Sequence, residues 1–165
     1  MASKATPLDL TITPRDQRFG RDSRPARWWN GGDPVASAFY NALSATFPKG
    51  EGFFVESVRA FREGAPPRLA AEIKSFVTQE VMHSREHQAF NRHAAEAGYD
   101  LEPLERRVDE RLDLVRSRHP IASLSATMAL EHFTAILAHE LLKDRRHLDL
   151  ADPDSAALWR WHAIE

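Results

Sequence analysis

The segment from Gln79 to His87 reads QEVMHSREH and contains two glutamates and two histidines. It lies within a series of residues spaced alternately by 4 and 3, which is the spacing of one helix face. That series is Leu69, Ile73, Phe76, Glu80, His83, His87 and Phe90. Both ends of this face are apolar, whereas a solvated face would be polar throughout. We therefore predict that Glu80, His83 and His87 point into the protein interior.

Three further helical segments place an acid or an imidazole on an otherwise apolar face. In the first, Glu51 precedes Phe54, Val58 and Phe61 at helical spacing. The second has one charge, Glu131, on the face made by Ile121, Leu124, Met128, Glu131, Ala135, Ala138 and Leu142. In the third, His162 shares a helix face with Leu158, Trp161 and Glu165. By contrast, Glu56 falls off the apolar face of its segment, so we expect it to be solvated.

Several carboxylates in one core would repel each other and lose their hydration unless they were paired or bound to a cation. A glutamate on one helix, a Glu-x-x-His pair on a second and a glutamate on a third make up most of the carboxylate-bridged dimetal pattern of four-helix bundles. The sequence therefore predicts metal ligands at Glu51, Glu80, His83 and Glu131. Taken singly, a histidine such as His87 is more often a core residue than a ligand.

Carboxylate and imidazole ligands without sulfur favour iron or manganese, with zinc possible. We expect two divalent ions, with iron favoured. A metal-bound histidine usually donates its other ring N–H to a neighbouring group. Glu86 and His87 are the expected outer shell on that basis.

The composition excludes several classes of protein. The chain has 165 residues, 42% of them hydrophobic, a net charge of −2 and no cysteine. These numbers indicate one domain, or a large piece of one, with a sizeable core. They exclude the basic surface of a nucleic-acid-binding protein and thiolate chemistry. The first residues lack the apolar run of a signal peptide, and no segment is expected to span a membrane. We expect a soluble cytoplasmic protein.

Turn and cap residues divide the chain into helices, and no segment alternates as a strand would. We predict an irregular N-terminal arm over 1–32 and a helical domain over 33–165. The first helix begins at Asp33-Pro34 and is expected to break at Pro48 and Gly50, with a second helical run ending near Arg62. The remaining predicted helices cover about 67–97, 103–119, 120–143 and 153–165. The expected fold class is all-α.

Four segments carry a resemblance to a known family: NALSATFPKGEGFF, FVTQEVMHSREHQAFN, ATMALEHFTA and LWRWHAIE. They resemble the bacterial family of predicted metal-dependent hydrolases, which is related to the ferritin-like superfamily, and the resemblance runs from about Arg15 to the end of the chain. It implies a ferritin-like four-helix bundle with additional short helices. It also implies metal-ligand positions at Glu51, Glu80, His83 and Glu131.

The last core helix of that family is similar to that of di-iron arylamine oxygenases, where a His-x-x-x-Glu-x-x-His motif supplies ligands. The first histidine of the motif would fall on His162, and its glutamate and second histidine would lie just past Glu165. We therefore expect the sequence to be part of a longer protein. An unfinished last helix would leave apolar faces uncovered, so we also expect a homodimer.

Three functions are compatible with such a site. We favour an oxygen-activating di-iron oxidoreductase acting on a small organic substrate, because the site would lie deep in an apolar bundle. The alternatives are a hydrolase that uses a metal-activated water and a metal-binding protein without turnover.

Overall fold

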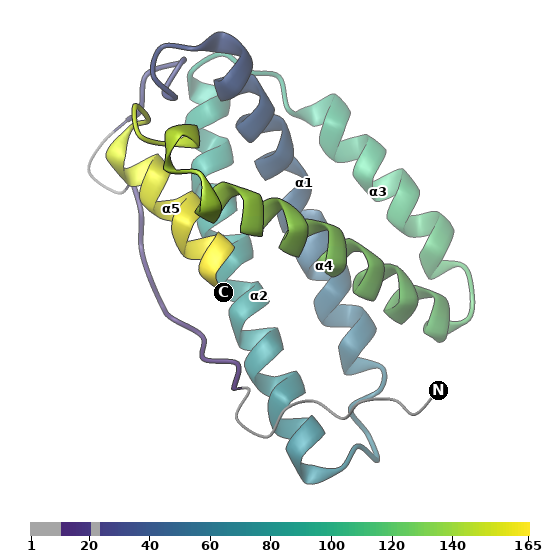
Figure 1. Cartoon of the computed structure of the whole chain (residues 1–165). Helices are drawn as coiled ribbons and strands as arrows, with labels where there is room; N and C mark the ends of the chain where they lie inside the picture. Colours follow the sequence, from purple (N-terminus) through teal and green to yellow (C-terminus); the bar gives the residue numbers. More distant parts are fainter. Residues whose placement is uncertain (1–10, 21–23) are drawn as a thin grey trace.

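The computed structural model describes residues 11–20 and 24–165 and confirms the all-α fold. Its helices are α1 (Pro34–Arg59), α2 (Pro67–Glu96), α3 (Glu102–Arg116), α4 (Pro120–Lys143) and α5 (Pro153–Ile164), with a short 3₁₀ turn at Arg145–His147. The long helices α1 and α2 run antiparallel, and α4 crosses in front of them (Figure 1). α5 then packs beside α2, so α1, α2, α4 and α5 surround the interior while α3 lies at one side.

The predicted break at Pro48 is wrong, because α1 is continuous from Pro34 to Arg59 and contains Pro48. A proline inside a helix has no N–H for the carbonyl four residues earlier, here that of Ser44. The side-chain Nδ2 of Asn91 donates to that carbonyl oxygen at 3.1 Å. A tertiary partner therefore satisfies the group that the proline leaves open, and α1 continues past it.

The other helix ends follow the predicted signals closely. Asp33 caps α1, and its Oδ1 accepts from the backbone N–H of Val35 at 2.8 Å and of Ala36 at 3.1 Å. Gly98 follows the end of α2 with φ of +92°, a conformation that favours glycine. Asp152 caps α5 by accepting from the backbone N–H of Ser155 at 2.9 Å.

The predicted N-terminal arm contains no helix in its described part, and residues 1–10 and 21–23 of that arm lie outside the described residues. Trp29 anchors the arm in a buried cluster with Tyr40, Phe90 and Trp159. Its indole Nε1 donates to Asn41 Oδ1 at 2.9 Å. The arm is therefore attached to the bundle close to α5.

Six residues on the predicted inward faces are instead exposed: Phe61, Leu69, Ile121, Met128, Ala135 and Leu142. Phe61 follows the end of α1 and Leu69 lies in the first turn of α2, and the described chain has no further helix at this end of the pair (Figure 1). Met128 is 67% exposed, since α4 contacts the bundle through a narrower face on which only Thr127 is buried.

The prediction that no segment is apolar enough to span a membrane is wrong for one helix, while the absence of a membrane partner stays a prediction. Pro120–Lys143 is long and apolar enough to cross a bilayer by length and composition alone. Its exposed side includes Met128, Phe133 and Ile136. The described chain therefore carries an apolar helix face that its own helices do not cover.

Candidate metal centre

Glu51 of α1 is a buried acid. Its exposed fraction is 2%, and neither carboxylate oxygen has a hydrogen-bond partner among the described residues. Burial raises its pKa well above the usual range, and the nearby charges of Glu80 and Glu131 raise it further. The Ser84 side chain lowers this pKa, and its effect is the smallest of the four. An uncompensated buried carboxyl of this kind is typical of a cation site.

Glu80 and His83 of α2 lie beside Glu51. Burial, followed by the charges of Glu131 and Glu165, raises the pKa of Glu80 to about 8. Burial lowers the pKa of His83 to about 4, so its ring is neutral near pH 7. Both ring nitrogens of His83 are buried without a hydrogen bond, and Nδ1 lies 3.8 Å from Glu80 Oε1. Neutral imidazole nitrogens with free lone pairs are what a metal ion requires.

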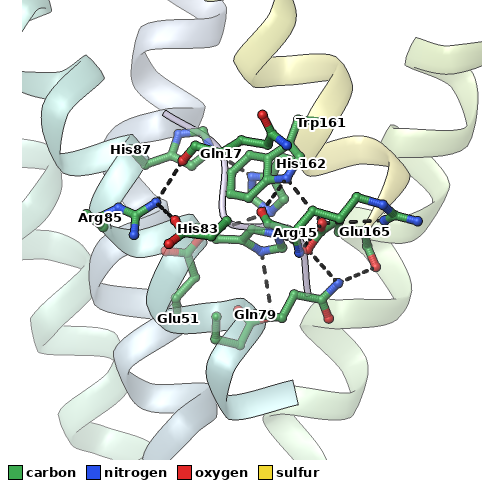
Figure 2. Close-up of polar contacts among 12 residues, drawn as sticks. Arg15, Gln17, Glu51, Gln79, His83, Arg85, His87, Trp161, His162 and Glu165 are labelled. Atoms are coloured by element: carbon green, nitrogen blue, oxygen red, sulfur yellow. Dashed lines mark hydrogen bonds and ion pairs between the residues drawn. The ribbon is translucent and has the colours of Figure 1, made fainter. Parts of the chain in front are cut away.

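Glu165 brings a further carboxylate from the end of α5. Its Oε2 lies 3.5 Å from His83 Nε2 and accepts from Gln79 Nε2 at 3.1 Å. Its Oε1 accepts from the backbone N–H of Arg15 at 2.8 Å and from Trp161 Nε1 at 3.1 Å. Figure 2 shows Gln79, Arg15 and Trp161 converging on this carboxylate. The N-terminal arm thus meets α2 and α5 at the edge of the cluster.

His87 and His162 form a pair on the other side of Glu51. Nε2 of His87 lies 2.6 Å from Nδ1 of His162, and Nδ1 of His87 lies 2.8 Å from the Ser44 hydroxyl oxygen. Burial lowers the pKa of both rings well below the usual range, and nearby histidines lower each further. Both rings are therefore neutral at physiological pH. The second nitrogen of His162, Nε2, faces Glu51 Oε1 at 4.0 Å.

These residues form two groups that could each hold an ion. One group is Glu51, Glu80 and His83, and the other is Glu51, His87 and His162. In each group the candidate ligand atoms lie within 4.8 Å of one another. The His83 and His162 rings are neighbours, with centroids 4.2 Å apart. Glu51 belongs to both groups, so the two candidate groups share a carboxylate.

Glu131 and Glu86 occupy different positions relative to this cluster. Glu131 comes from α4, and burial raises its pKa. Its charge in turn raises the pKa values of Glu51 and Glu80, although Glu131 belongs to neither three-residue group. Glu86 accepts from Arg85 Nε at 2.6 Å and from the backbone N–H of Phe19 at 3.0 Å, so it links α2 to the arm. Their roles as ligand and outer-shell residue stay predictions.

Sequence reasoning missed three polar residues that line the cluster. Gln79 lies outside the series of inward-facing residues that contains Glu80 and His83, yet it is buried and donates to Glu165. Gln79 lies one helical turn before His83, so a prediction that allowed a broader inward face on this helix would have included it. Ser44 and Asn91 are also buried and support His87. Small polar residues on a helix give no signal of their own. Only the helical spacing of Ser44 to Glu51 and of Asn91 to His87 could have placed them on the same helix faces as the site.

The donor set fits a metal ion. It consists of carboxylates and neutral imidazoles, several of them buried and without hydrogen bonds, which suits iron, manganese or zinc. A possible metal site made of glutamates and histidines is therefore present in the fold.

Comparison with curated proteins and with solved structures yields no match. A family model described as "Predicted metal-dependent hydrolase" matches residues 13–165. This match covers nearly the whole chain and includes every residue of the two candidate groups. The chain belongs to the family of predicted metal-dependent hydrolases.

Proposed function

We propose that this protein is a carboxylate-bridged dimetal protein of the ferritin-like type that activates oxygen and oxidises a small organic substrate. The observation that carries the proposal is Glu51, a buried carboxyl without hydrogen bonds that both candidate ligand groups share. One shared carboxylate between two sets of neutral imidazoles is the arrangement that holds two ions close together. Iron is the favoured metal, since it binds this ligand type and is redox-active.

Each residue has a defined task in this proposal. Glu51 would contribute to both positions, Glu80 and His83 would hold one ion, and His162 would hold the other. Glu131 approaches from α4 and compensates the remaining charge. When bound, a di-ferrous pair supplies the electrons that reduce oxygen. The protein contributes the fixed geometry of these side chains and the exclusion of bulk water.

Aromatic side chains provide that exclusion. The Phe47 ring lies edge-on to His87 and His162, with centroid distances of 4.7 and 4.8 Å. The Trp161 ring lies 4.8 Å from that of His83. A shell of this kind admits a small apolar molecule such as oxygen more readily than a polar substrate. It therefore supports oxidation over hydrolysis.

The alternative is hydrolysis by a metal-activated water, and the family description favours it. In that case the ions lower the pKa of a bound water, and Glu80 or Glu165 would accept its proton. Such an enzyme needs no redox-active metal and works with zinc.

Metal analysis of the purified full chain, combined with its visible spectrum, decides between the two. For the oxidative function we expect iron, with an absorption band that bleaches with dithionite and returns in air. A colourless protein that contains zinc and cleaves model esters would contradict this proposal and support hydrolysis. A protein without bound metal would contradict both.

A further inference from the structure

The hydrogen bonds around His87 form a chain in which every proton can be placed. It begins at the backbone carbonyl of Ser44, which can only accept. Asn91 Nδ2 donates to this oxygen at 3.1 Å, and this contact fixes the orientation of the Asn91 amide. The other end of the amide, Oδ1, therefore faces the Ser44 hydroxyl oxygen at 2.6 Å.

The next step fixes the tautomer of His87. Asn91 Oδ1 can only accept, so the Ser44 hydroxyl must use its single proton to donate to it. The Ser44 oxygen is then left as an acceptor for the His87 ring nitrogen Nδ1 at 2.8 Å. The neutral His87 ring thus carries its proton on Nδ1 and leaves Nε2 unprotonated.

The same reasoning extends to His162. The unprotonated Nε2 of His87 lies 2.6 Å from Nδ1 of His162, and two lone pairs at that distance would repel. His162 must therefore donate from Nδ1. A neutral ring that is protonated on Nδ1 leaves its Nε2 lone pair free, and this atom faces Glu51 Oε1 at 4.0 Å.

We infer that Ser44 and Asn91 are positioning residues, which set the tautomers of His87 and His162 and so present the Nε2 lone pair of His162 to a metal beside Glu51. His87 then supports His162 as its hydrogen-bond acceptor. The use of this lone pair by a metal rests on the proposed function, whereas the proton order does not.

The sequence contains the reason for this arrangement. Pro48 has no N–H to donate to the Ser44 carbonyl, so that oxygen remains available to Asn91. Asn91 lies one turn after His87 on α2, and Ser44 lies one turn before Pro48 on α1. The series of hydrogen bonds therefore alternates between α1 and α2 before it reaches His162 on α5, and Ser44, Asn91 and His87 are all buried.

The proton order can be measured without metal, using the full chain labelled with ¹⁵N-histidine at neutral pH. We expect two-bond ¹H–¹⁵N spectra to show His87 and His162 both protonated on Nδ1 and unprotonated on Nε2. Protonation of either ring on Nε2 in this spectrum would overturn the inference, whatever the protein does with metals.

The positioning role is tested by Ser44→Ala, with Ser57→Ala as a matched control. Ser57 is likewise a buried serine of α1, but its hydroxyl contacts Phe54 O and Thr127. We expect Ser44→Ala to give mixed tautomers at both rings and to weaken Fe²⁺ binding about 10- to 100-fold in an anaerobic titration. Ser57→Ala should change neither measurement.

Two results would overturn the positioning role. The first is a Ser44→Ala spectrum with unchanged tautomers, and the second is a lost tautomer order with unchanged Fe²⁺ affinity. A wild-type chain with the expected proton order that binds no Fe²⁺ would overturn the proposed function and the presentation of His162 to a metal. The proton order itself would stand in that case.

Discussion

The side-chain amide of Asn91 takes the place of the backbone N–H that Pro48 lacks, because Asn91 Nδ2 donates at 3.1 Å to the Ser44 carbonyl in the middle of α1. This contact joins the two longest helices at the level of the histidine pair. Both the continuity of α1 and the proton order at His87 depend on it.

This relationship predicts energetic coupling between Asn91 and Pro48. Asn91→Ala should destabilise the protein by about 1–3 kcal/mol, since it leaves a buried carbonyl and a buried hydroxyl unsatisfied. In a Pro48→Ala background the new N–H can reach the Ser44 carbonyl, so the same substitution should cost about 1 kcal/mol less. Urea unfolding of the four proteins of this double-mutant cycle measures the difference. Equal costs in the two backgrounds would show that the proline and the amide act independently.

The second prediction separates ligand function from stability at Glu51. Glu51→Gln keeps the shape of a carboxyl whose pKa burial raises well above its usual range, so we expect the melting temperature of the metal-free chain to stay within a few degrees. Metal retention should nevertheless be lost, because an amide is a poor bridging ligand. Glu56→Gln is the control, since Glu56 is exposed and pairs with Arg116 at 2.9 Å.

Elemental analysis after dialysis checks this prediction. Metal bound by the Glu51 variant at the wild-type level would contradict the role of Glu51. Glu80→Gln and Glu131→Gln extend the test, and the comparison of the two shows whether the glutamate of α4 is a ligand as the sequence predicts.

The sequence predicted the helices and the main site residues because both leave a periodic signal. Asp33, Gly98 and Asp152 mark helix ends by local chemistry, which needs no knowledge of the tertiary structure. Glu51 and Glu80 stood out as charges on apolar faces. Pro48 misled the prediction because its effect is cancelled by Asn91, a residue 43 positions away that no local rule can identify.

Other errors in the predicted burial arise because the sequence does not show how many helices pack against a given helix. The apolar residues of α4 suggested a fully inward face, yet Met128 is exposed because a single narrow row around Thr127 meets the bundle. Periodicity identifies an apolar face but says nothing about what covers it. The role of Ser44 could not be predicted, because a small polar residue on a helix gives no signal until its hydrogen-bond partners are known.

The third prediction concerns the pH dependence of metal binding. The metal must displace the proton of Glu80, whose pKa in the metal-free protein is raised to about 8. Affinity should therefore rise about tenfold per pH unit between pH 6 and 8 from this group alone, and more steeply if Glu51 also releases a proton. Calorimetry in buffers of different ionisation enthalpy counts the protons released. Binding that is independent of pH in this range would contradict buried, protonated acids.

The fourth prediction concerns the stability of the metal-free protein. Glu80 has a raised pKa of about 8, so its contribution to stability is full below the unfolded value of 4.5 and is lost as the pH rises to 8. His83 has a lowered pKa of about 4, so its contribution is present above 6.5 and is lost as the pH falls to 4. Glu51 acts in the same direction as Glu80, and His87 and His162 act in the same direction as His83.

The acids favour the metal-free fold at low pH and the histidines favour it at high pH. The stability of the metal-free protein should therefore be highest at an intermediate pH. From pH 6.5 to 8 only the carboxyls titrate, so stability should fall by about 1.4 kcal/mol per pH unit for each acid that remains protonated in the fold. Below pH 6.5 the three histidines offset the acids. We expect the melting temperature of the metal-free chain to be highest near pH 6.5. A steady rise from pH 5 to 8 would contradict the burial of these acids.

The last prediction concerns the exposed face of α4, and it follows from the expected homodimer. Phe133 and Met128 are 64% and 67% exposed on a helix whose only charges between Pro120 and His139 come from Glu131. We propose that a second copy of the chain covers this face, because an apolar surface of this length is unfavourable in water. Sedimentation velocity should show a dimer in the wild type and a monomer for Phe133→Glu. Leu150→Glu, a change at an even more exposed apolar residue outside α4, should leave the dimer intact. A wild-type monomer that binds phosphatidylcholine vesicles through α4 would contradict the dimer and indicate that lipid covers this face instead.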